Sequence, residues 1–161
     1  MDGRGRFAAL VAVFAAALFI ALTICISGFV SLFAGSPVIV ERGTGPLLVP
    51  LMFTAATAAV FALIGLIGAG APTRPVLSAI GIGVCAYLAF LLCGAVIYTF
   101  ERGRVILGLL FLASNALSPY AIAVGATALV VSGGAIALLL VRSAGGATQP
   151  PHWPWDRRPP E

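Results

Sequence analysis

The chain has 161 residues, of which 61% are hydrophobic and only 9% are charged. A single domain of this length cannot bury so much apolar surface away from water, which excludes a soluble globular protein. The nine basic residues are all Arg and lie scattered near the ends of apolar runs. They therefore do not form the clustered positive surface of a nucleic-acid-binding protein, and they suit contact with lipid head groups.

Four long stretches contain no charged residue, and each exceeds the roughly 18–20 residues that a membrane-spanning helix needs. We therefore predict an all-α membrane protein, a four-transmembrane-helix bundle embedded in the lipid bilayer. The uncharged stretches are residues 7–40, 43–73, 75–100 and 105–141.

The first span is predicted over residues 7–33, after a short N-terminal segment of residues 1–6. Its 27 residues are about twice the 7–15 apolar residues of a signal peptide, so we expect an uncleaved helix. The alternative is a signal peptide cleaved near the small residues 34–36. A loop rich in Pro and Gly is predicted over residues 34–46.

The second and third spans are predicted over residues 47–69 and 76–98, joined by a tight turn over residues 70–75. Small side chains recur at four-residue spacing in the third span, which predicts one helix face that lets another backbone approach closely. We expect this face to pack against another span of the same chain; the alternative is an interface with a second copy or a membrane-protein partner. The four residues are Gly81, Cys85, Ala89 and Cys93.

The last apolar run must be interrupted, because its 37 residues would form a helix of about 56 Å, far longer than the ~30 Å hydrocarbon core. Ser118 is a good N-cap and Pro119 suits a first helical turn, so they indicate a helix start. We predict a loop over residues 99–118 that contains a short apolar helix (105–113), and a fourth span over residues 119–141. The rival interpretation is one long helix kinked at Pro119. Both give four crossings.

The C-terminal segment, residues 142–161, is rich in Pro and is expected to be extended. Its aromatic and basic residues predict anchoring at the head-group layer. Binding of a soluble partner in extended form is the alternative. The residues concerned are Trp153, Trp155, Arg157 and Arg158.

Four spans place both termini on the same side of the membrane. That side holds six Arg and the other side three, and the excess predicts that both termini are cytoplasmic. The six are Arg4, Arg6, Arg74, Arg142, Arg157 and Arg158; the three are Arg42, Arg102 and Arg104.

Candidate chemistry is sparse. Ionisable residues fall in predicted loops or at span ends, which argues against an ion-coupled transporter. One His and no paired carboxylates provide neither a metal site nor a catalytic triad, so we expect no enzyme and no cofactor. The most conspicuous polar residue at membrane depth is Asn115, expected to cap the break or to hydrogen-bond another span.

Two functional classes stay open. The first is a non-catalytic accessory or assembly protein that acts through helix packing and its C-terminal tail. The second is a small, oligomeric passive permease or channel-like protein, which would have a wet cavity lined by Thr57, Ser78 or Asn115.

Three short motifs carry a family resemblance: Gly45-Pro46-Leu47, the residues 115–119, and Pro-x-Trp-Pro-Trp-Asp at 151–156. On these motifs and on its span order, the chain resembles a family of uncharacterised small four-span membrane proteins of actinobacteria. The resemblance implies the four-span fold and an actinobacterial host, and we expect the chain to lie in the bacterial cytoplasmic membrane. It implies no activity and no functional residues.

Overall fold

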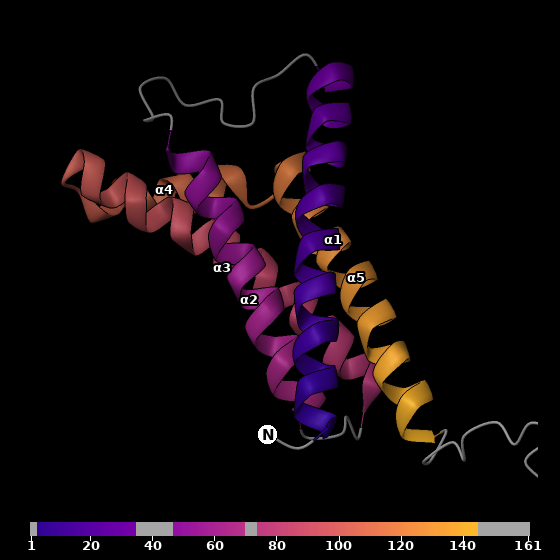
Figure 1. The fold of residues 1–161 in the computed structure, drawn as a ribbon. Helices are drawn as coiled ribbons and strands as arrows, with labels where there is room; N and C mark the ends of the chain where they lie inside the picture. The colour runs from indigo at the N-terminus through magenta and orange to yellow at the C-terminus, as the bar shows by residue number, and fades with distance from the viewer. Residues whose placement is uncertain (1–2, 35–46, 70–73, 145–161) are drawn as a thin grey trace, which may run out of the picture.

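The computed structural model describes residues 3–34, 47–69 and 74–144, and these form five helices (Figure 1). Four of the five are long and apolar enough to cross a membrane, and α4 is too short. The predicted all-α, four-span architecture with a short helix before the fourth span is therefore confirmed. The helices are α1 (Gly3–Ala34), α2 (Leu48–Ala69), α3 (Pro75–Arg102), α4 (Val105–Asn115) and α5 (Pro119–Ala144).

The four long helices form a closed ring: α1 packs against α2, α2 against α3, α3 against α5, and α5 against α1. The start of α1 and the end of α5 lie at the same end of the bundle (Figure 1). There the Arg142 guanidinium lies 4.1 Å from the centre of the Phe7 ring. The first span therefore begins, and the fourth span ends, at the same end of the bundle.

Small residues set how closely the long helices approach, because helices that are apolar all round have no polar face to orient them. A Cβ added to Gly68 would lie 2.8 Å from the Cβ of Ala8, so α1 and α2 touch there. A Cβ added to Gly83 would lie 3.1 Å from the Cβ of Leu129, which marks the contact of α3 with α5. The positions of these glycines therefore determine where the helices pack most closely in the core.

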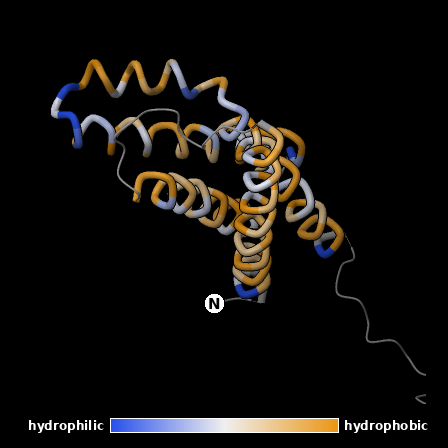
Figure 2. Tube along the Cα trace, turned by 90° about the horizontal axis from the view of Figure 1, so that it is seen from above, coloured by the Kyte–Doolittle hydropathy of each residue, from blue (hydrophilic) through white to orange (hydrophobic). Residues whose placement is uncertain are grey.

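The outer part of α3 and the whole of α4 form a helical hairpin that projects away from α1 (Figures 1 and 2). Gly103 ends α3 in a left-handed conformation with φ 66°, and its N–H donates to the Thr99 carbonyl oxygen at 2.8 Å. Glycine suits this position since it has no Cβ to clash there. Figure 2 shows the hydrophilic turn at the tip of the hairpin, between two apolar helices.

The break before the fourth span lies where the sequence predicted it. α4 ends at Asn115, two residues beyond the predicted end, and α5 begins at Pro119. The Ser118 hydroxyl oxygen accepts a hydrogen bond from the Ala121 N–H at 3.1 Å, as an N-cap should. Two separate helices are thus correct, and the alternative of one long kinked helix is wrong.

Candidate functional site

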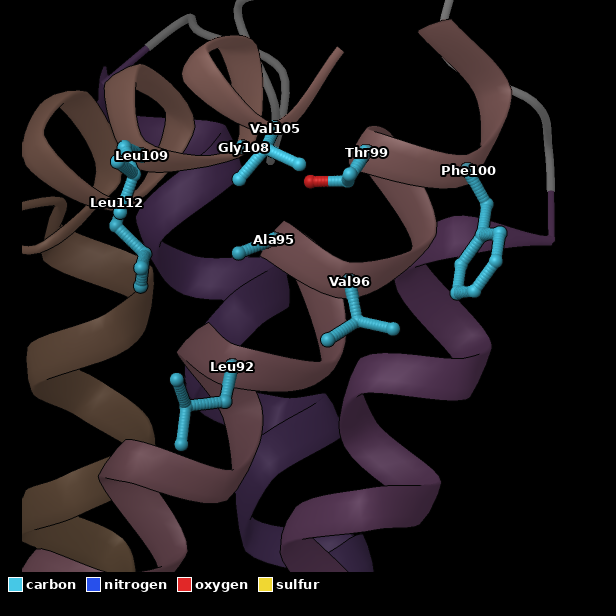
Figure 3. A pocket seen from close by; sticks show the side chains of 9 residues that line it. All are labelled: Leu92, Ala95, Val96, Thr99, Phe100, Val105, Gly108, Leu109 and Leu112. Carbon is cyan, nitrogen blue, oxygen red and sulfur yellow. The ribbon is translucent and has the colours of Figure 1, made fainter. Parts of the chain in front are cut away.

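An apolar groove of about 270 Å³ lies between α3 and α4 (Figure 3). Its walls are almost entirely apolar, and it runs beside the hairpin towards the charged turn. We call it the α3–α4 groove. It is lined by Leu92, Ala95, Val96, Thr99 and Phe100 of α3 and by Val105, Gly108, Leu109 and Leu112 of α4.

Gly108 allows α4 to lie directly on α3. A Cβ at this position would overlap the Thr99 hydroxyl oxygen and would lie 2.9 Å from the Ala95 carbonyl oxygen. Close backbone approach at small residues is the usual way in which helices associate in membranes. The missing side chain therefore sets the spacing of the two helices that form the groove walls.

Phe111 anchors α4 from the opposite side. Its side chain is fully buried, and its ring stacks on that of Tyr98 with centroids 5.3 Å apart. It fills the space above Gly94, where an added Cβ would lie 2.7 Å from the ring and 2.6 Å from the Met52 side chain. The hairpin is consequently fixed to the bundle on one flank and open along the groove on the other.

The turn between the two helices brings three charged side chains to the end of the groove. Glu101, Arg102 and Arg104 are all exposed, and together they carry one net positive charge. The Arg102 guanidinium also lies 5.6 Å from the centre of the Tyr98 ring, a cation–π contact that limits its movement. The groove is thus apolar along its walls and basic at this end.

A second apolar groove, of about 230 Å³, lies between the first half of α3 and the second half of α5. It is lined by Pro75, Val76, Ala79, Ile80, Leu129, Gly133, Ile136, Ala137 and Leu140. Among the described residues, Arg74 is the one arginine directly next in sequence to a lining residue of this groove, Pro75.

The predicted small-residue face of α3 does not pack inside the chain as a unit. Gly81 and Cys85 are exposed, and a Cβ added to Gly81 would meet nothing within 4 Å. Ala89 is half-buried, and Cys93 reaches α2, where its thiol donates to the Leu51 carbonyl oxygen at 3.6 Å. The expectation of intramolecular packing is therefore wrong for the first two residues.

The physical reason is rotation about the helix axis. Four residues advance an α-helix by slightly more than one turn, so each step drifts by about 40° and three steps by about 120°. The row of small residues accordingly winds from the outer face at Gly81 to the α2 contact at Cys93. The core face of α3 is instead marked by Gly83 and Gly94.

Asn115 does not bond to another span. Its side-chain amide donates to the Phe111 carbonyl oxygen and to the Ser114 hydroxyl, both at 3.1 Å, and so holds the last turn of its own helix. The bond between helices at the break comes from Tyr87, whose hydroxyl donates to the Ala116 carbonyl oxygen at 2.5 Å. The sequence reasoning missed Tyr87, although a tyrosine in an apolar span usually needs such a partner.

Most hydroxyls at membrane depth bond within their own helix. Thr57 donates to the Phe53 carbonyl oxygen at 2.8 Å and Ser78 to that of Arg74 at 3.0 Å. Ser132, like Tyr87, also reaches another helix: its buried hydroxyl lies 3.1 Å from the Ala79 carbonyl oxygen of α3 and 3.1 Å from the Leu129 carbonyl oxygen of its own helix. Among the described residues, the buried hydroxyls of Thr23 and Thr127 have no hydrogen-bond partner.

The four predicted tail residues, Trp153, Trp155, Arg157 and Arg158, lie outside the described residues, so their role stays a prediction. Within residues 3–34, 47–69 and 74–144, no three His, Cys, Asp or Glu side chains lie close enough together to hold a metal ion.

Comparison with known proteins places the chain in a family. No curated protein and no solved structure matches it. Residues 1–161 match a protein family described as a family of unknown function, DUF6121. The chain, a multi-pass membrane protein by its four apolar helices, therefore belongs to the DUF6121 family.

Proposed function

We propose that this protein is a non-catalytic accessory or assembly protein that binds a transmembrane helix of another membrane protein through the outward face of α3. The observation that supports this role is the exposure of Gly81 and Cys85 on the surface of the bundle. The space over Gly81 is open, so the backbone of a second helix could approach closely there. Small residues on a lipid-facing surface favour helix contact over lipid solvation.

The competing class, a passive permease, receives less support from the polar side chains. It would use Thr57, Ser78 or Asn115 to line a wet path. Each of these groups instead donates to a carbonyl oxygen in the preceding turn of its own helix. The two grooves described above are both apolar. We therefore propose only the accessory role.

Two natural cysteines allow a matched test of the binding face. Cys85 on α3 and Cys25 on α1 are both exposed. Single-cysteine variants that retain one or the other, with the remaining two cysteines replaced by Ala, would be labelled in native membranes with a photoreactive maleimide. We expect irradiation to join another membrane protein to the Cys85 variant at several times the yield of the Cys25 variant.

Two outcomes would contradict the proposal. Equal yields from both variants would mean that α3 has no special binding face. A product made only of two copies of this chain would assign the face to a homo-oligomer instead of an accessory complex. Partners captured at Cys85 would be identified after mild-detergent purification.

We further propose that the host is an actinobacterium and that both termini face its cytoplasm. Among the described residues, four arginines lie at the end that holds the start of α1: Arg4 and Arg6 in α1, Arg74 directly before α3, and Arg142 near the end of α5. Only two, Arg102 and Arg104, lie at the turn between α3 and α4. The bias of basic residues towards the first end supports this orientation. A reporter that is active only outside the cytoplasm, fused after Glu161, should be inactive; activity would reverse the assignment.

A further inference from the structure

We propose that the α3–α4 groove binds one acyl chain of an anionic phospholipid, with the lipid phosphate held at the turn by Arg104. This site is separate from the outward face of α3 near Gly81, and the inference does not depend on the proposed accessory role.

The groove is long enough to hold part of a hydrocarbon chain. From Leu92 to Phe100 it follows α3 for about 12 Å, at ~1.5 Å per residue. About 270 Å³ of space lies along that length between the two helices, and the groove is open to the surroundings of the bundle along one side.

The walls have the chemistry of a lipid contact. Val96, Phe100, Val105 and Leu109 present apolar side chains, and all four are exposed to the surroundings of the bundle. Gly108 adds depth because it contributes no side chain to the floor. In a membrane the available occupant is the acyl chain of a neighbouring lipid. Since ~12 Å is less than half of the ~30 Å hydrocarbon core, the groove holds part of a single chain.

The charge at the turn selects the head group. Arg104 directly precedes Val105, which lines the groove, and its side chain is exposed. Arg102 stands in the same turn beside Tyr98, and Glu101 offsets one of the two positive charges. A guanidinium fork matches the oxygens of a phosphate. The opposite end, near Leu92 and Leu112, is apolar, so only one orientation of the lipid places its phosphate beside arginine.

The test compares two lipids that differ only in head-group charge. Full-length protein, purified in mild detergent and freed of lipid, would be mixed with equal amounts of phosphatidylglycerol and phosphatidylcholine that carry identical acyl chains. Native mass spectrometry would then count the bound lipids. We expect the wild type to retain phosphatidylglycerol preferentially, and Arg104→Gln to reduce that preference about fivefold, the effect of about one basic side chain at a lipid surface. Arg6→Gln, at the other end of the bundle, should leave the preference unchanged.

A second pair of variants tests the groove itself. Val96→Phe should fill the groove and lower the binding of both lipids, whereas Val130→Phe on α5 should not. Val96 and Val130 are 52% and 67% exposed, so neither change crowds the core. Equal retention of both lipids by the wild type, identical behaviour of the two Arg variants, or identical behaviour of the two Phe variants would overturn the proposal. A second copy of the chain bound in place of lipid would overturn it as well.

Discussion

Replacing Gly108 by Ala should weaken the attachment of α4, although alanine is the better helix former. The added Cβ would overlap the Thr99 hydroxyl and approach the Ala95 carbonyl oxygen to 2.9 Å. The hydroxyl can rotate away, but the carbonyl belongs to the backbone of α3, so α4 must move outward. A gain of about 1 kcal/mol in helix propensity opposes an overpacking cost of about 1–3 kcal/mol. We expect the free energy of unfolding to fall by about 1 kcal/mol.

The measurement is reversible unfolding of the full-length protein in mixed micelles with increasing dodecyl sulfate, followed by circular dichroism. Gly81→Ala is the matched control, because a Cβ there meets nothing within 4 Å and should leave stability unchanged or slightly higher. Adding Thr99→Ala to Gly108→Ala should restore only part of the loss, since the backbone obstacle at Ala95 remains. If Gly108→Ala proves as stable as Gly81→Ala, the close contact of α4 with α3 is refuted.

Three further substitutions probe the hairpin and the bundle by the same unfolding measurement. Tyr87→Phe removes the bond to the Ala116 carbonyl oxygen and should cost about 1 kcal/mol, a typical value for a hydrogen bond between membrane helices; unchanged stability would show that this bond does not hold the break. Ser132→Ala removes the bond to the Ala79 carbonyl oxygen and should cost about 0.6 kcal/mol, and a larger loss would indicate that a cavity, more than the bond, matters there. Gly103→Ala places a side chain at φ 66° and should cost about 1 kcal/mol; unchanged stability would show that the turn does not need glycine.

The number and order of helices could be predicted from the sequence because bilayer thickness and charge are strong constraints. Charged residues mark the ends of spans, and a run of 37 uncharged residues cannot be one crossing. Ser118 and Pro119 then fixed the break locally, through a cap and a proline whose geometries suit only the start of a helix. These features depend on neighbouring residues and on the length of each apolar run, so they can be predicted without knowing how the helices pack.

The inward faces of the helices could not be predicted in the same way. In a soluble helix the apolar stripe identifies the buried side, but here Leu77 and Leu88 are exposed while Ala86 is buried. The hydrophobicity of a side chain therefore does not indicate whether it faces the core. The fit between the surfaces of neighbouring helices decides which face of each helix is buried. The prediction that the small residues from Gly81 onwards form one packed face was wrong for this reason. Their spacing is regular, but their positions turn gradually around the axis of α3.

Contacts between distant residues were equally hidden. Tyr87 and Ala116 are 29 positions apart, and nothing near either residue indicates the other. Gly108 sits in a run of large apolar residues, and its importance follows only from the Thr99 side chain and Ala95 carbonyl that it meets. This contact could have been predicted from one signal in the sequence. A single glycine stands in a short apolar helix, and small residues occur on the helix before it.

The small residues of α3 serve two different contacts, and the difference in their surroundings explains why the two proposed ligands differ. Near Ala95 and Thr99, the helix is already covered by α4, and the space that remains beside the contact is the apolar α3–α4 groove. Seven residues before Leu92, at Cys85, the same side of α3 is no longer covered by α4, since seven residues make almost two full turns. Here Gly81 and Cys85 are exposed, and a Cβ added to Gly81 would meet nothing within 4 Å. The position of α4 along α3 therefore separates the proposed lipid groove from the proposed protein-binding face.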